Sequence, residues 1–338
     1  MIIDGKNIAT EYGMTLLRGS YDSLFKYPAR KKVDFSDYAE RDGIIPDLRK
    51  FEFEPRGIVL NFAVKHNNYN DFITKYETFF SHITEAGYRN MIFENGMQCN
   101  LRYDKTTAYR APFVSTSGFS TFTLNFIEDV YSGWGVGNGT LIGTNIQNYY
   151  IIDGIDFGNF GVYPDGNIGE VLKYPDVKPS FTDGLHYDTD TVKLKHKEIN
   201  IPLYMTARTK QEFLTNHAAF ISCFKKTGKQ LLFIKEINAA TYVYYLDCTS
   251  FNVHWTNQPI AKFSIRLMIP VVTWIGRGVE LWTLLLDPSL NMLLGDEHGR
   301  ALAVKVNSNY ELWMMLLDTN TNMLLGDGQG RALGIMIN

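Results

Sequence analysis

The sequence predicts a mainly β (α+β) protein with two tandem antiparallel β-sandwich or barrel domains, each with one flanking helix. A small β appendage of two short repeats follows them. Three observations support this prediction: a long internal repeat, strand-like runs around a single helical stripe in each copy, and a high aromatic content. The aromatic fraction of 14%, with 20 Tyr and 22 Phe, favours β structure with large buried contacts. A chain of 338 residues is long enough for two domains and an appendage.

Four short motifs near the N-terminus recur in the same order in the middle of the chain. The offset drifts only from 149 residues, between Ile2 and Ile151, to 146 residues, between Phe35 and Phe181. Small loop deletions produce such a drift, so we interpret residues 1–130 and 150–272 as two copies of one domain. The paired motifs are Ile2-Ile3-Asp4-Gly5 with Ile151-Ile152-Asp153-Gly154, Tyr12-Gly13 with Phe160-Gly161, Lys26-Tyr27-Pro28 with Lys173-Tyr174-Pro175, and Phe35-Ser36-Asp37 with Phe181-Thr182-Asp183.

Each copy contains one helical pattern among strand-like runs. In the first copy, apolar residues recur at helical spacing from Phe72 to Ile83, and Gly87 supplies the stop. In the second copy, the capping box from Thr209 to Glu212 opens a helix that ends before Gly228. The strands expected around these helices are residues 58–64, 91–93 and 121–127 in the first copy, and 199–205, 231–234 and 261–269 in the second.

Polar residues with turn signals lie between the Tyr-Pro motif and the strand before the helix in each copy. They include Arg41, Asp42 and Gly43 in the first copy, and Asp188 and Asp190 in the second. We interpret each stretch as a long hairpin that reaches out of the sandwich. Exposed strands invite pairing with other chains, so these five residues are candidates for an inter-subunit or channel contact.

A glycine-rich segment, residues 131–149, joins the two copies. Alternate glycines between Ser132 and Thr140 are typical of a flexible linker. A phosphate-binding loop requires Gly-Lys followed by Ser or Thr, and this segment lacks that sequence.

The C-terminal repeats, residues 279–307 and 310–338, match at a constant offset of 31, as Glu280 and Glu311 show. Turn residues separate short apolar runs, so each repeat is expected to form two or three strands. Trp282 and Trp313 are candidate partner-docking residues. They either belong to the core or stack on the sugar rings of a glycan.

The sequence shows no catalytic or metal-binding constellation. The seven histidines form neither H-x-x-x-H nor H-x-H, and no G-x-S-x-G motif is present. His186 lies near two aspartates that offer metal ligands, but the polar residues of a hairpin explain this cluster better. His217 lies on the apolar face of its helix, which favours a hydrogen-bonded core histidine. We therefore predict no enzyme, no cofactor and no metal.

The three cysteines, Cys99, Cys223 and Cys248, are widely spaced, which indicates buried free thiols in a reducing compartment.

Net charge and hydropathy indicate which kinds of partner the protein is not expected to bind. The formal charge is −3, with both signs mixed along the chain, which argues against a general nucleic-acid coat. A neutral or acidic wall still permits nucleic acid to pass without sticking. No signal peptide, polybasic patch or apolar run of the ~20 residues that a membrane span needs is visible, so we expect synthesis in the cytoplasm and no membrane partner.

The motifs resemble those of a known structural family. The opening Ile2-Ile3-Asp4-Gly5-Lys6-Asn7-Ile8, the following Tyr-Gly, and the arginine and Asp-Gly before a long strand pair resemble phage distal tail proteins. The wider group is the tail-tube-like fold of tail tube, distal tail and baseplate hub subunits. The resemblance covers residues 1–130 and, as a second copy, 150–272, and it does not reach the C-terminal repeats.

The resemblance implies a virion protein of the phage tail tip, assembled in the host cytoplasm. Extended strands of neighbouring domains would form a β-ring around a channel for DNA, which would be only passing cargo. The ring would join the tail tube to the distal tail, hub or receptor-binding apparatus. Familiar distal tail proteins carry one tube-like domain, so two copies in one chain leave both a trimer and a hexamer open. The alternative function is a carbohydrate-binding protein that uses the two C-terminal tryptophans.

Overall fold

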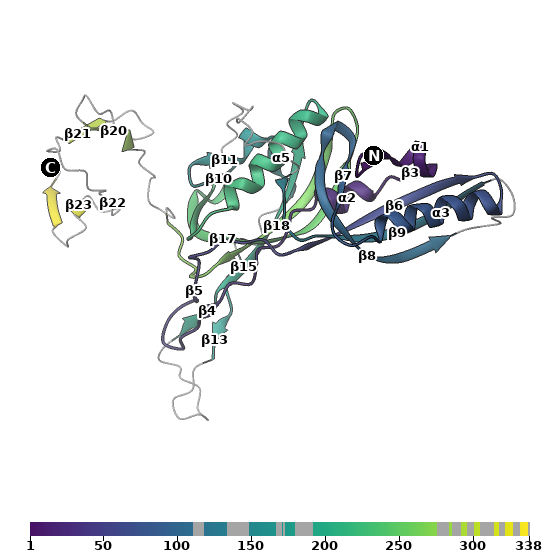
Figure 1. Ribbon diagram of the computed structural model, residues 1–338. Coiled ribbons are helices and arrows are strands. Elements are labelled where there is room, and N and C mark those ends of the chain that lie inside the picture. The colour runs from purple at the N-terminus through teal and green to yellow at the C-terminus, as the bar shows by residue number, and fades with distance from the viewer. Residues whose placement is uncertain are drawn as a thin grey trace. The chain divides into compact units, whose positions relative to one another are not determined.

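The computed structural model describes residues 1–110, 118–133, 149–166, 171, 173–179 and 192–275, and six strands between residues 284 and 336. It is mainly β, as predicted (Figure 1). The chain divides into two compact units. One comprises Met1–Lys235 and Thr241–Thr273, and the other comprises Glu236–Ala240 and Trp274–Asn338.

Two seven-stranded sheets with the same strand order form the larger part of the structure. In spatial order the first sheet consists of β2 (Lys6–Asn7), β1 (Ile2–Ile3), β7 (Arg89–Ile92), β8 (Gln98–Arg110), β9 (Gly118–Glu128), β6 (Arg56–His66) and β3 (Met14–Leu16). The second consists of β11 (Ile155–Asp156), β10 (Tyr150–Ile152), β16 (Gln230–Ile234), β17 (Ala239–His254), β18 (Ile260–Ile269), β15 (Lys197–Thr206) and β12 (Val162–Pro164). The expected domain boundaries stay a prediction.

One long helix accompanies each sheet, at the position that the apolar stripes predict. Helix α3 (Tyr69–Ile83) packs against β6, and α5 (Lys210–Phe224) lies against the second sheet (Figure 1). The capping box is confirmed, because Thr209 Oγ1 accepts a bond from Glu212 N at 3.1 Å. The Glu212 carboxylate accepts in turn from Arg208 N at 2.9 Å. These bonds satisfy amides at the helix start that have no intrahelical partner.

The first half also contains two short α-helices, α1 (Ile8–Tyr12) and α2 (Ser20–Phe25), where the sequence predicted none. Five or six residues are too few to show a helical period. The structure also contains the short 3₁₀ helices η1 (Glu94–Gly96), η3 (Phe157–Phe160) and η4 (Lys235–Ile237).

The repeated Ile-Ile-Asp-Gly motif has the same structural role in both halves. Asp4 and Asp153 have φ angles of 47° and 48°, and the glycine after each has φ 81°. Two successive positive φ values define the tight turn that joins β1 to β2 and β10 to β11. Each aspartate also accepts a bond from the neighbouring strand, Asp4 Oδ1 from Asn90 N at 2.7 Å and Asp153 Oδ1 from Leu231 N at 2.9 Å.

The strand registers establish which residues correspond between the sheets. Two β-bulges interrupt the β8–β9 pairing, and two interrupt β17–β18 at the matching places. Before the bulges Tyr103 pairs with Phe126, as Tyr245 pairs with Leu267. After the bulges Tyr109 pairs with Phe122. Phe251 pairs with Phe263 in the same way. Tyr103 and Tyr109 therefore correspond to Tyr245 and Phe251.

The core of each half lies between its helix and its sheet. In the first half Phe62 and Phe122 stack, with ring centroids 5.6 Å apart, and Phe79 contacts both from α3. In the second half Phe220 of α5 contacts Phe263 of β18 at 5.8 Å. Burial of each such side chain contributes about 1.5–3 kcal/mol to the free energy of folding.

Two hairpins project from the sheets and form what we call the arm (Figure 1). The first pairs β4 (Phe35–Ser36) with β5 (Ile45–Pro46), and the second pairs β13 (Val177–Lys178) with β14 (Lys193–Leu194). The hairpin expected around Arg41–Gly43 is thus present. Asp188 and Asp190 lie outside the described residues.

The smaller unit contains two three-stranded antiparallel sheets, one for each short repeat. The first consists of β19 (Leu284–Leu285), β20 (Met292–Gly295) and β21 (Ala301–Val304), and the second of β22 (Met314–Leu317), β23 (Asn322–Gly326) and β24 (Ala332–Met336). Trp282 and Trp313 lie outside the described residues, so their docking role stays a prediction.

Candidate assembly surface

The most extensive polar and aromatic contacts join the first half of the chain to the second sheet. They centre on the first Tyr-Pro segment, residues 26–28, which leaves α2 and lies over α5 and the second sheet. Tyr27 is buried, with 2% of its surface exposed. Its ring stacks on His217 at 4.2 Å and makes edge contacts with Phe251 at 5.8 Å and Phe263 at 5.7 Å. We call His217, Phe251 and Phe263 the aromatic site of the second sheet.

Hydrogen bonds fix this segment at both ends. Tyr27 donates its hydroxyl to His217 O at 3.2 Å, and Tyr245 donates its hydroxyl to Pro28 O at 2.9 Å. Arg30 N donates to Leu246 O of β17 at 2.7 Å. The first half thus satisfies polar groups along the outer side of β17, which would otherwise be an exposed strand edge.

His217 also donates a hydrogen bond, to the main chain just before the Tyr-Pro segment. Its Nε2 lies 2.7 Å from Phe25 O, and a carbonyl oxygen can only accept, so Nε2 carries a proton and donates. Burial lowers the pKa of His217 to about 3. The imidazole is therefore neutral at neutral pH. This agrees with the predicted core histidine.

Burial also raises the pKa of the Tyr27 hydroxyl well above its usual value. The contact between Tyr27 and His217 is therefore uncharged at neutral pH.

A buried ion pair positions the Tyr-Pro segment from the other side. Arg56, the first residue of β6, pairs with Glu128 at 2.5 Å, and both side chains are almost fully buried. The same guanidinium donates to Lys26 O, directly before Tyr27, and lies over the Tyr131 ring at 4.9 Å. Buried guanidinium–carboxylate pairs hold their neighbours in one geometry, because losing either partner leaves an uncompensated charge.

We call the contact between residues 21–30 and the second sheet the join. A second aromatic contact extends it to the far end of β17. The indole of Trp255 stacks on Tyr21 at 5.5 Å and contacts Phe25 at 4.9 Å. Its Nε1 donates to Glu94 Oε2 at 2.9 Å. A bond from the Lys210 ammonium to the same carboxylate lowers the pKa of Glu94. Two aromatic residues of α2 are thus fixed against the second sheet.

The tip of the first hairpin contacts the base of the second hairpin in the same chain. Lys178 Nζ donates to Arg41 O at 3.0 Å and to Gly43 O at 2.6 Å, and it pairs with Asp37. Leu194 accepts from Gly43 N at 2.8 Å and donates to Asp42 Oδ1 at 2.8 Å. The three predicted residues therefore lie in a contact between the two halves. Their predicted role between subunits or at a channel stays a prediction.

Gly43 lies at the tightest point of this contact. Its φ angle is 66°, and a Cβ built there would lie 1.8 Å from Pro270 O. Ile44 N donates to the same carbonyl at 2.8 Å. Glycine is required here both by the left-handed backbone and by the close approach of the second half.

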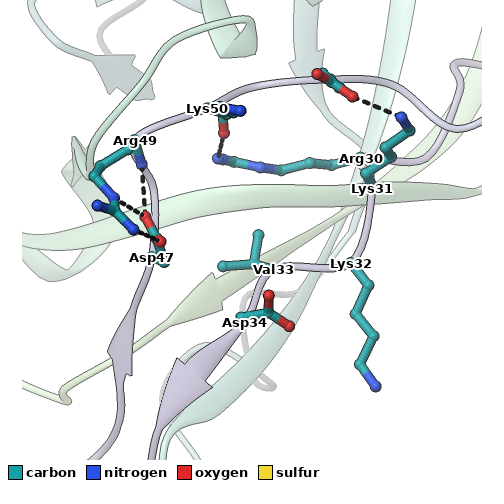
Figure 2. Close-up of a pocket in the computed structure, with 9 residues that line it drawn as sticks. Arg30, Lys31, Lys32, Val33, Asp34, Asp47, Arg49 and Lys50 are labelled. Atoms are coloured by element: carbon teal, nitrogen blue, oxygen red, sulfur yellow. Dashed lines mark hydrogen bonds and ion pairs between the residues drawn. The ribbon is translucent and has the colours of Figure 1, made fainter.

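A pocket of about 660 Å³ lies at the base of the first hairpin (Figure 2). Arg49 and Asp47 form a salt bridge there, and a hydrogen bond from Arg49 lowers the pKa of Asp47 to about 2. Arg30 donates to Lys50 O at 2.9 Å. Five basic and three acidic side chains line the pocket, which gives it a small positive excess, and they are Arg30, Lys31, Lys32, Arg49, Lys50, Asp34, Asp47 and Glu52.

A metal site and a reactive thiol each require particular titratable groups in a particular environment. Among them, no group of three or more His, Cys, Asp or Glu is placed to hold a metal ion. All three cysteines are buried free thiols. Burial raises the pKa of Cys223 to about 11 and that of Cys248 to about 12, and it raises the pKa of Cys99 as well. Thiols held protonated in this way are weak nucleophiles. In the described part of the chain, no helix has the length and apolarity needed to cross a membrane.

Sequence reasoning identified Tyr27 only as part of a repeated motif. It did not identify its partners His217, Phe251 and Tyr245, because contacts between the two halves leave no periodic signal in one sequence. The recurrence of Lys-Tyr-Pro was the available signal.

Comparison with known proteins finds a likeness to a solved structure. No protein-family model matches the chain. No curated protein matches it either. The chain is similar to a crystal structure of SPP1 Dit protein, described as a paradigm of the hub adsorption apparatus in phages that infect Gram-positive bacteria. The two are 12% identical, the TM-score is 0.29, and the match covers 79% of this chain and 96% of the other.

Proposed function

We propose that this protein is a structural subunit of a phage tail tip. It forms a ring around the DNA channel and joins the tail tube to the distal tail, hub or receptor-binding apparatus. The proposal rests on the motifs that resemble distal tail proteins and on one structural observation. That observation is the join in which residues 21–30 cover the outer side of β17.

This join is the kind of contact that a ring subunit makes with its neighbour. Two sheets of the same strand order are placed one after the other, and the edge of one is covered by a segment of the other. The contact is heterologous, because different surfaces of the two sheets meet. Contacts of this kind, repeated between chains, produce a ring when the rotation closes. Three chains would supply six copies of the sheet domain, and six chains would supply twelve.

The charge distribution fits a channel through which DNA passes. The net charge of −3 comes from interspersed acidic and basic residues, as in the arm and the Figure 2 pocket. Strong retention of DNA requires many basic side chains that displace counterions from phosphates. A wall of mixed charge does not retain DNA in this way.

Electron microscopy tests this proposal. Negative-stain images of the purified full chain are expected to show rings with an open centre, and light scattering of the same fraction gives the number of chains. In particles whose genome encodes this chain, gold-labelled antibodies against it are expected at the tail tip. A monodisperse monomer at high concentration, combined with absence of label from the tail, would refute the proposed function.

A further inference from the structure

A second Tyr-Pro segment, residues 173–175, repeats the first in sequence and in the way its main chain is held. Arg56, at the start of β6, donates to Lys26 O, and Lys197, at the start of β15, donates to Lys173 O. The two tyrosines differ in their surroundings. Tyr27 is 2% exposed, whereas Tyr174 is 76% exposed. The second segment is thus presented like the first, but its tyrosine lies in solvent.

The main chain after each Tyr-Pro segment also has the same pairing. Glu54 N donates to Ala29 O, and Lys195 N donates to Asp176 O, both at 2.8 Å. In an antiparallel pair, the residue after such an acceptor directs its own N–H away from the partner strand. This residue is Arg30 in the first segment, where the N–H bonds to Leu246 O. Val177 occupies the same position in the second segment.

The first sheet contains the counterpart of the aromatic site that Tyr27 fills. The matching registers and bulges place Tyr109 and Phe122 where the second sheet has Phe251 and Phe263. The N-caps of the two long helices, Asn68 and Thr209, correspond to each other. Tyr76 of α3 lies eight residues after Asn68, and His217 of α5 lies eight residues after Thr209. We call Tyr76, Tyr109 and Phe122 the aromatic site of the first sheet. Tyr76 lies 5.9 Å from both of the other rings.

This site is open in the single chain. Tyr109 is 50% exposed, whereas its counterpart Phe251 is 8% exposed. Tyr103, the counterpart of Tyr245, has its hydroxyl 3.0 Å from Thr106 Oγ1. The outer half of β8, from Arg102 to Arg110, is exposed at every residue except the half-buried Tyr103. An exposed strand edge beside the half-exposed Tyr109 ring is a surface for β-strand pairing, with Tyr76 half-buried and Phe122 buried below it.

We infer that the second Tyr-Pro segment of one chain docks on the aromatic site of the first sheet of a second copy of this chain. The contact repeats the join inside the chain. The Tyr174 ring lies against Tyr76 and Tyr109 of the second copy. Tyr103 of that copy donates to Pro175 O, and Val177 N donates to Asp104 O, as Arg30 N does to Leu246 O.

The filled aromatic site of the second sheet indicates which segment occupies the site of the first sheet. The segment that fills the second sheet is a Lys-Tyr-Pro sequence held by a basic residue at the start of a neighbouring strand, and Tyr174 belongs to the second such sequence in the chain. Each chain then offers the site of its first sheet and the exposed tyrosine of its second Lys-Tyr-Pro sequence, so the contact continues from chain to chain. The inference rests on the proposed function, because this contact is the one through which the ring would close.

Cross-linking tests the contact in the full chain. A double variant with Asp104→Cys and Val177→Cys keeps Tyr174 and the aromatic site and places two exposed thiols beside the main-chain bond of the contact. Treated with a short bis-maleimide, it is expected to give a ladder of covalent multimers on a denaturing gel. The ladder ends at the number of chains in the ring. Each single variant gives no ladder beyond dimers. The three native cysteines stay unreactive, because they are buried and their thiols are protonated. The reagent does not require disulfide geometry.

A matched control uses an exposed residue on another strand of the first sheet. Thr15 is exposed in β3, which β9 and β6 separate from β8. The double variant Thr15→Cys with Val177→Cys is expected to give no ladder.

The outcomes separate this contact from the proposed function. Equal ladders from the two double variants, or no ladder, would overturn the contact even if the unmodified chain forms rings. A ladder from the Asp104 and Val177 pair together with absence of the protein from the tail tip would support the contact and refute the proposed function.

Discussion

The aromatic sites of the two sheets occupy corresponding positions but differ in occupant and in residue type. In the second sheet His217 and Phe251 are buried under Tyr27. In the first sheet Tyr76 is half-buried and Tyr109 is exposed, because no segment of the described chain covers them to the same extent. Phenylalanine suits a contact that is permanent. Tyrosine tolerates water in the free chain and still supplies a large apolar area in a complex. The residue types thus match one join inside the chain and one between chains.

A lysine pair shows the same contrast at the arm. Lys178 is buried, and its ammonium bonds to the tip of the first hairpin. Lys31 precedes its hairpin at the matching position, yet its side chain is 56% exposed and pairs only with Glu52 among the described contacts. The first half therefore contacts the second within the chain, and the corresponding surface of the first half stays exposed.

The largest effect is expected from emptying the filled site. Tyr27→Ala removes a buried ring from between His217 and Phe263 and should lower the free energy of unfolding by about 3–5 kcal/mol. Urea unfolding measures this change. Tyr27→Phe keeps the ring and removes only the bond to His217 O, so it should cost about 1 kcal/mol. A loss of less than 1 kcal/mol for Tyr27→Ala would show that the join contributes little to the fold.

The next largest loss of stability is expected from a substitution at Gly43, in the contact that the first hairpin of the arm makes with the second half. Gly43→Ala places a methyl group against the main chain at Pro270 and adds strain at a φ of 66°, so we expect a loss of about 3 kcal/mol. Gly5→Ala is the matched control. Its φ is 81°, and no atom lies within 4 Å of the added Cβ, so only the left-handed strain of about 1–2 kcal/mol applies. Equal losses for the two variants would contradict the close approach at Pro270.

Acid should weaken the filled site through His217. In the unfolded chain the imidazole takes up a proton as the pH falls below its ordinary pKa of 6.5, whereas the folded protein holds the pKa at about 3. The contribution to stability is therefore complete above pH 6.5 and is lost as the pH falls toward 3, by about 1.4 kcal/mol per pH unit. Urea midpoints from pH 7 to pH 5 measure this slope. His217→Gln should flatten it, and an unchanged slope would assign the acid sensitivity to other groups.

The sequence predicted the elements of each half better than the contacts between them. Helices α3 and α5 follow from apolar residues at helical spacing, and the start of α5 follows from the capping box at Thr209. The Ile-Ile-Asp-Gly motif was recognised as a repeat, and it forms the same tight turn in both halves. These features are local, so their chemistry is visible in a few consecutive residues.

The join was not predicted, because Tyr27 meets His217 across 190 residues of sequence. A Tyr-Pro pair is also an ordinary loop sequence, and only its recurrence pointed to a role. The prediction of a single helix in each copy was wrong for the first half, since α1 and α2 are too short for a period to show. The predicted roles of Asp188, Asp190, Trp282 and Trp313 stay predictions.

The measurement that tests the central claim most directly is the solution mass of the Tyr174→Ala variant by light scattering. Tyr174 is exposed in the single chain, so the free energy of unfolding of the variant chain should lie within about 0.5 kcal/mol of that of the unmodified chain. We predict that the unmodified chain forms a closed oligomer and that Tyr174→Ala is a folded monomer at the same concentration. Thr15→Ala, on a strand separated from β8 by β9 and β6, should keep the oligomer. A Tyr174→Ala variant with the mass of the unmodified oligomer would contradict the account.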